Sequence, residues 1–182
     1  MPSSNINIKN VAVIGAGVMG AQLAALFANK GIRSYLYDIT TDTATLGKDR
    51  LKIIKPPPLE QPENIELIQA CGLDKDIHKI KKVDWIIEAV PEKIEIKIEV
   101  FKKISPYIHK RAILSSNTSG ITLNELIKNL PANLKSRFLI THFFNPPRYM
   151  KLLEIVKNEQ TSLETYNSCL LYTSDAADDI PR

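Results

Sequence analysis

His142 is the residue of this sequence best placed to transfer a proton. It follows a short apolar run at 138–140 and precedes Asn145 and a Pro-Pro pair, and Glu154 lies in the next apolar run. If the intervening loop folds back, the Glu154 carboxylate can hold one ring nitrogen of the imidazole. From the residues alone, the alternative is a structural histidine buried against a backbone carbonyl, with Glu154 as a solvated strand residue.

A second pattern concerns nucleotide binding. Gly15, Gly17 and Gly20 follow the apolar run Val11–Ile14 with the spacing G-x-G-x-x-G. Gly15 permits a tight turn, Gly17 lets the backbone approach a pyrophosphate, and Gly20 lets the next helix lie close to the strand. Asp38 ends the following apolar run, where it can accept both ribose hydroxyls of an adenosine and would repel a 2′-phosphate. The context favours an NAD site over a glycine-rich turn of some other α/β protein.

Three further polar residues have two possible roles each. Ser119 lies in a polar loop and could donate a hydrogen bond to a substrate oxygen, or it could be an ordinary turn serine. Glu92 and Lys97 flank the expected cofactor side of the sheet, or they are only surface charge. The other two histidines, His78 and His109, are expected in exposed positions.

The elements that would carry these residues alternate along the chain. Short apolar runs predict strands, and apolar residues at helical spacing predict helices. The predicted strands are 11–14, 32–38, 83–90, 112–114, 138–140 and 151–156, and the predicted helices are 21–28, 44–54, 92–104 and one opened by a capping box at Thr122 and Glu125. Residues 65–70 fit either type. This order predicts an α/β fold with a Rossmann-like, doubly wound and mostly parallel sheet, whose ligands bind beyond the carboxyl ends of the strands.

Composition narrows the function further. The length of 182 residues suits one domain, and a composition of 44% hydrophobic and 24% charged residues is typical of a globular protein. The net charge is +4. The dispersed lysines fit a solvated surface or attraction to an anionic nucleotide or coenzyme A, and there is no aromatic-basic motif for nucleic acid. The two cysteines and three histidines show no metal-ligand or disulfide pattern. With no secretory signal and no membrane-spanning run, we expect a cytoplasmic protein without membrane or nucleic-acid partners.

Four segments in order carry a resemblance to a known family: GAGVMG, EAVPE, SSNTSG and THFFNPPRYMKLLEIV. Over about residues 8–165, the sequence resembles the NAD-binding domain of 3-hydroxyacyl-CoA dehydrogenases, most closely the bacterial fatty-acid β-oxidation type. The resemblance implies NAD as cofactor, an acyl-CoA as substrate and oxidation of 3-hydroxyacyl-CoA to 3-oxoacyl-CoA. It also implies that the full-length protein is a homodimer or part of a multifunctional β-oxidation protein.

The same resemblance implies roles for individual residues. His142 is the general acid/base, Glu154 orients it, and Ser119 contacts substrate or cofactor. The residues implied to bind the cofactor are Gly15, Gly17, Met19, Gly20, Asp38, Val90, Glu92, Lys97, Ser119 and Asn145.

The sequence also departs from the family. Thr41–Lys55 is shorter than the helical hairpin that contacts coenzyme A in the family, and the all-helical domain that follows in the family is absent here. Asn167–Arg182 has no continuing periodicity and resembles a translated sequencing-adaptor or vector sequence rather than native protein. We therefore expect an NAD-binding domain at 1–165, a non-native tail at 166–182 and low activity for this chain. The alternatives are a catalytically incompetent NAD-binding fragment or a dehydrogenase of a free β-hydroxy acid.

Overall fold

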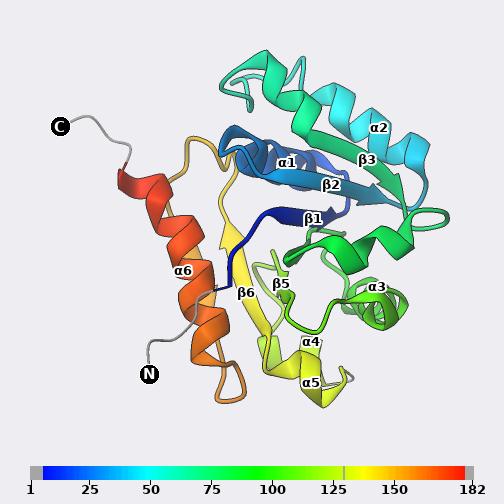
Figure 1. Cartoon of the computed structure of the whole chain (residues 1–182), viewed down its shortest axis with the longest axis vertical. Helices are drawn as coiled ribbons and strands as arrows, with labels where there is room; N and C mark the ends of the chain where they lie inside the picture. The colour runs from blue at the N-terminus through cyan, green and yellow to red at the C-terminus, as the bar shows by residue number, and fades with distance from the viewer. Residues whose placement is uncertain (1–5, 129, 179–182) are drawn as a thin grey trace.

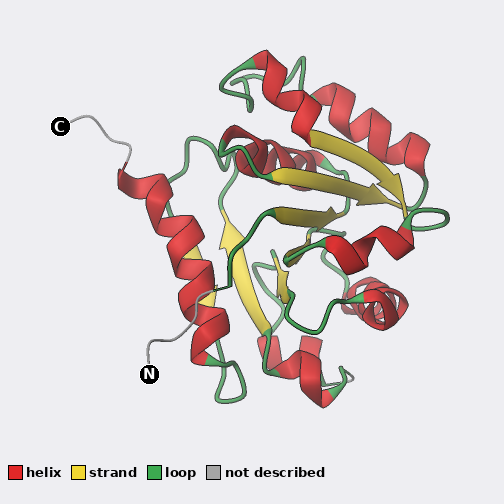
Figure 2. Ribbon diagram, viewed as in Figure 1, coloured by secondary structure: helices red, strands yellow, loops and turns green. Residues whose placement is uncertain are grey.

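A single sheet organises the fold (Figures 1 and 2). The computed structural model describes residues 6–128 and 130–178, and in this part of the chain the strand order is β3-β2-β1-β4-β5-β6-β7. The strands are β1 (Asn10–Ile14), β2 (Arg33–Asp38), β3 (Ile68–Gly72), β4 (Trp85–Glu88), β5 (Ile113–Ser116), β6 (Phe138–Phe143) and β7 (Leu153–Val156). Neighbouring strands are parallel except β6 and β7, which are antiparallel. The predicted Rossmann-like, mostly parallel sheet is confirmed.

Helices cover both faces of the sheet. They are α1 (Val18–Asn29), α2 (Thr41–Arg50), α3 (Ile94–Ile104), α4 (Leu123–Ile127), α5 (Ala132–Lys135) and α6 (Leu163–Asp178), with short 3-10 helices η1 (Pro62–Leu67), η2 (Ile77–Lys82) and η3 (Ser105–Tyr107). Val11 and Val13 of β1 pack in one core with residues of α1, α2 and α6, whereas Ala12 and Ile14 pack in a second core with residues of α3, α4 and α5. Successive side chains of a strand alternate between faces, so both cores are built from the same strands. No helix within the described residues is long and apolar enough to cross a membrane.

Most predicted boundaries differ from the structure by a few residues. The helix predicted at 44–54 is α2, which begins earlier because Thr40 and Thr43 form a capping box, and it ends at Arg50. Residues 65–70 are divided between η1 and β3. Strand β6 continues past the predicted end to Phe143, because β7 pairs with its last four residues.

The chain beyond the predicted domain boundary at residue 165 takes part in the fold, because this boundary falls inside α6. The Ser168 hydroxyl accepts a hydrogen bond from the Ile6 N–H at 2.8 Å, and the Tyr172 hydroxyl accepts one from the Ile8 N–H at 2.7 Å. The segment 166–178 therefore belongs to the fold, although the predicted domain ended at residue 165. Its non-native origin stays a prediction, and residues 179–182 lie outside the described residues.

Candidate active site

The glycine turn after β1 is shaped by close backbone packing. Gly15 has φ +108°, and a Cβ at this position would lie 2.6 Å from the Ala89 carbonyl oxygen. A Cβ on Gly20 would lie 1.8 Å from the Gly15 carbonyl oxygen, whereas a Cβ on Gly17 would have no neighbour within 4 Å. Gly15 and Gly20 are therefore required by the fold itself. Gly17 instead leaves open space at the start of α1.

That open space suits a phosphate. Gly17 is the N-cap of α1, no side chain of the described residues caps this end, and no acidic residue lies in the first turn. The first N–H groups of a helix lack intrahelical partners and carry the positive end of the helix dipole. The start of α1 therefore offers donors to an anion, as the predicted pyrophosphate site requires.

Asp38 lies beside this turn. Its Oδ2 accepts a hydrogen bond from the Ala16 N–H at 2.7 Å, and its Oδ1 accepts one from the Ile39 N–H at 2.8 Å. Each carboxylate oxygen can accept a further hydrogen bond, so the group can still take ribose hydroxyls. Asp38 lines a cavity of about 550 Å³ together with Gly15, Gly17, Met19 and Val90. This cavity has the size and the donor and acceptor groups for part of a dinucleotide.

The two glycines should respond differently to a methyl group. Gly17→Ala should leave thermal stability nearly unchanged, because its Cβ meets no atom, but it should weaken NAD binding by about tenfold or more through contact with the pyrophosphate. Gly20→Ala should lower the melting temperature, because its Cβ would overlap the Gly15 carbonyl oxygen. Calorimetric NAD titration and thermal unfolding of both variants test this. An unchanged NAD affinity in Gly17→Ala would contradict a pyrophosphate position at this turn.

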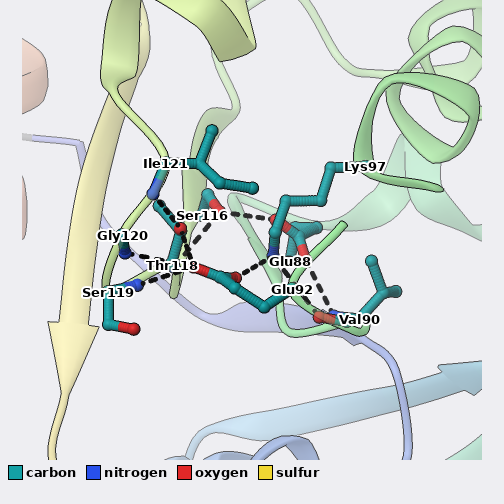
Figure 3. Close-up of polar contacts among 9 residues, drawn as sticks. All are labelled: Glu88, Val90, Glu92, Lys97, Ser116, Thr118, Ser119, Gly120 and Ile121. Atoms are coloured by element: carbon teal, nitrogen blue, oxygen red, sulfur yellow. Dashed lines mark hydrogen bonds and ion pairs between the residues drawn. The ribbon is translucent and has the colours of Figure 1, made fainter. Parts of the chain in front are cut away.

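Lys97 is not a surface charge. Its side chain is 1% exposed, and its Nζ lies 2.8 Å from Glu88 Oε1 and 3.1 Å from Glu92 Oε2 (Figure 3). The Glu88 side chain is fully buried. Burial raises the pKa of the Glu88 carboxyl, and the Lys97 ammonium, the Ser116 hydroxyl and the Val90 N–H act against that rise. The surface-charge alternative for Lys97 is therefore wrong, and a buried pair of charges lies at the end of β4.

Glu92 connects this pair to the loop after β5. Its Oε1 accepts hydrogen bonds from the Thr118 hydroxyl and from the N–H groups of Ser119 and Gly120. Burial raises the pKa of the Glu92 carboxyl, but the bonds from Thr118 and Lys97 outweigh it and lower the pKa to about 2. Glu92 is thus an ionised anchor for the loop that carries Ser119.

Sequence reasoning missed Glu88. The available signal was a carboxylate directly after the apolar residues Trp85, Ile86 and Ile87, with a lysine nine positions later. A charged residue in a buried strand needs a partner of opposite charge. A search for such a partner would have pointed to Lys97.

The structure brings His142 and Glu154 together. They face each other in the antiparallel register of β6 and β7, and His142 Nδ1 lies 2.7 Å from Glu154 Oε2. Beside an ionised carboxylate the ring proton belongs on Nδ1, which leaves a lone pair on Nε2. The ring also lies 4.5 Å from the Phe144 ring, centroid to centroid. This arrangement presents a base whose ring orientation is held by a carboxylate.

Ser119 shares a cavity with this pair. Ser119, His142 and Glu154 all line a cavity of about 420 Å³. Asn117, two residues earlier in the same loop, accepts a hydrogen bond from the Phe143 N–H at 2.9 Å through its Oδ1. The loop after β5 and the end of β6 are therefore tied together around the cavity.

Asn145 connects the segment after β6 to helix α1. Its Oδ1 accepts a hydrogen bond from Gln22 Nε2 at 2.9 Å, and Gln22 belongs to α1. The segment after β6 is thereby joined to the helix that begins at Gly17. Of the ten predicted cofactor residues, five line the cavity beside Asp38, and the other five do not: Gly20, Glu92, Lys97, Ser119 and Asn145.

Comparison with known proteins places these features in a family. The family model described as "3-hydroxyacyl-CoA dehydrogenase, NAD binding domain" matches residues 10–176. A fatty acid oxidation complex trifunctional enzyme of Rickettsia felis is 44% identical over 164 residues, which are 86% of this chain and 23% of that protein. A 3-hydroxyacyl-CoA dehydrogenase of Deinococcus radiodurans is 39% identical over 86% of this chain and 47% of its own length. The chain thus spans less than half of these curated relatives.

Solved structures agree with this result. The 3-hydroxybutyryl-CoA dehydrogenase of Escherichia coli K12 superposes with a TM-score of 0.80 at 29% identity, over 94% of this chain and 37% of that one. A diketoreductase described as acting on dicarbonyl compounds superposes with a TM-score of 0.82 at 26% identity, over 93% of this chain and 62% of that one.

Proposed function

The chain belongs to the 3-hydroxyacyl-CoA dehydrogenase family, as its NAD-binding domain, and from this premise we propose that it is the cofactor-binding part of an enzyme that oxidises 3-hydroxyacyl-CoA to 3-oxoacyl-CoA. The observation that carries this proposal is the His142–Glu154 pair, which shares a cavity with Ser119. The cavity beside Asp38 lies beyond the carboxyl ends of parallel strands, where such sheets bind their ligands. The cavity with His142 lies between the loop after β5 and the strands β6 and β7. A positioned base and a dinucleotide site at one edge of a sheet are what alcohol oxidation requires.

The reaction removes a proton from the 3-hydroxyl and a hydride from C3. Bound NAD supplies the hydride acceptor. His142 Nε2 accepts the hydroxyl proton, and Glu154 holds the ring through Nδ1 and stabilises the imidazolium that forms. Ser119, which lines the same cavity, donates a hydrogen bond to the substrate oxygen. Asp38 and the start of α1 hold the adenosine ribose and the pyrophosphate.

The wider setting follows from the relatives. The Rickettsia felis protein and a protein of Idiomarina loihiensis are named as a trifunctional enzyme and as the alpha subunit of fatty acid oxidation complexes. We propose that this chain acts in fatty-acid β-oxidation on an acyl-CoA, as part of a multifunctional protein or a homodimer. The chain by itself should bind NAD but turn over slowly, because the family's helical domain contributes to the substrate site.

Steady-state assays test this function. With the helical domain of the family restored, the enzyme should reduce acetoacetyl-CoA with NADH. A free β-hydroxy acid should not be oxidised at a comparable rate. Turnover of the free acid alone would favour the other β-hydroxyacid dehydrogenases, and NAD binding without any turnover would favour an incompetent fragment.

Asp38 should set the cofactor preference. Asp38→Ala should weaken NAD binding and narrow the difference in affinity between NAD and NADP, because the carboxylate accepts ribose hydroxyls and repels a 2′-phosphate. Asp42→Ala, which removes an exposed carboxylate from the first turn of α2, is the matched control and should change neither affinity. Calorimetric titration with both cofactors measures this. Equal affinity of the unmodified chain for NAD and NADP would contradict the assignment.

A further inference from the structure

Glu88 is a buried ionisable group that the proposed mechanism does not use. It is the last residue of β4, and its side chain is fully buried. Its Oε1 accepts hydrogen bonds from the Val90 N–H at 2.7 Å and from Lys97 Nζ at 2.8 Å, and its Oε2 accepts one from the Ser116 hydroxyl. Both oxygens are therefore used to hold other segments, one on each side.

These bonds close into a ring of five side chains (Figure 3). From Glu88 the ring runs through Lys97 to Glu92 Oε2 at 3.1 Å. From Glu92 Oε1 it continues through the Thr118 hydroxyl, and the Thr118 N–H returns to the Ser116 hydroxyl at 3.3 Å. Ser116 donates back to Glu88. A closed ring restrains its members together, because no bond can break without displacing its neighbours.

The ring is connected through Glu92 to the loop that carries Ser119. The N–H groups of Ser119 and Gly120 each lie 3.1 Å from Glu92 Oε1. Ser119 lines the cavity that contains His142 and is not among the residues that line the cavity beside Asp38. Through the loop 117–120 the ring therefore acts on the substrate side of the site, whereas Val90, which donates to Glu88, lines the cavity on the cofactor side.

We propose that Glu88 is a positioning residue: through Ser116 on one side and Lys97 and Glu92 on the other, it holds the loop 117–120 so that Ser119 faces the same cavity as His142. The claim that Glu88 holds the loop depends only on the hydrogen bonds of the ring. The expected effect on turnover rests on the proposed function. The two carboxylate oxygens receive the Ser116 hydroxyl and the Lys97 ammonium at once. Glu88→Met has a similar length but no oxygen to accept either donor, so it loses both links.

Hydrogen exchange of the Ser119 and Gly120 amides tests this directly, because both residues are exposed and their N–H groups are bonded to Glu92. In Ser116→Ala and in Glu88→Met, exchange of these two amides should accelerate about tenfold or more. Ser115→Ala is the matched control. Ser115 is equally buried on the adjacent position of β5, but it accepts from Trp85 Nε1 and the Thr141 hydroxyl, outside the ring. It should lower the melting temperature without accelerating exchange in the loop.

Kinetics separate positioning from stability. In the enzyme with its helical domain, Ser116→Ala should raise KM for the acyl-CoA about fivefold or more and leave the NAD affinity within about twofold. Equal acceleration of exchange in Ser115→Ala, or no acceleration in Ser116→Ala and Glu88→Met, would overturn the proposal. If the parent enzyme has no turnover with acyl-CoA but the loop amides respond as expected, the role of Glu88 in holding the loop stands and the proposed function fails.

Discussion

Replacing His142 with Gln should lower kcat by about 100-fold or more in the enzyme with its helical domain restored, the range for loss of a positioned general base. The structure supports this size of effect because His142 lines the cavity that contains Ser119, and Glu154 holds its Nδ1 at 2.7 Å. The NAD affinity should hardly change, since the cavity beside Asp38 is lined by other residues. His78→Gln, at an exposed position in η2, is the control and should keep normal kcat.

Glu154 should act through His142. Glu154→Gln should also lower kcat, because the imidazole loses the carboxylate that holds its ring and stabilises its charge. The double variant should lose much less than the product of the two separate fold-losses, because the pair acts as one unit. Steady-state kinetics of the three variants measure this. Multiplicative losses, or normal kcat in His142→Gln, would show that His142 has a structural role.

Replacing Lys97 with Met should reduce the free energy of unfolding by roughly 3–5 kcal/mol, the cost of leaving a buried charge without its partner. Lys97 is 1% exposed and neutralises Glu88, which is fully buried, and Met has a similar length and suits a helix. Lys103→Met on the same helix is the matched control. Its side chain is exposed, so the change should cost about 1 kcal/mol or less. Urea unfolding of both variants at pH 7.5 measures the difference.

The destabilisation in Lys97→Met should depend on pH. Without the ammonium, burial raises the pKa of the Glu88 carboxyl further above its unfolded value. A group whose pKa is raised on folding favours the folded state at low pH, and this contribution is lost as the pH rises through the folded pKa. The difference between Lys97→Met and the parent should therefore shrink when unfolding is measured at pH 5. A difference that is the same at both pH values would contradict a further rise of the Glu88 pKa in Lys97→Met.

Much of the fold could be predicted from the sequence because it depends on short-range patterns. The apolar run 11–14 followed by Gly15, Gly17 and Gly20 defines a strand, a turn and a helix within a few residues. Apolar residues at strand and helix spacing report burial directly, and their alternation predicts a parallel sheet. Asp38 could be placed beside the glycine turn because it ends the neighbouring strand. Boundaries were less accurate where side chains compete for backbone groups, as at Thr40 before α2.

Which charged side chains meet could be seen only in the tertiary structure. Glu154 meets His142 because β7 runs antiparallel to β6 in one particular register, and a shift of one residue would turn Glu154 to the other face. Glu88 meets Lys97 and Ser116 because the ends of β4 and β5 lie side by side at the start of α3. Sequence periodicity shows which positions are apolar, but not which polar group faces a given charge. That depends on where distant strand ends meet, and the penalty for burying an unpaired charge then selects the partners.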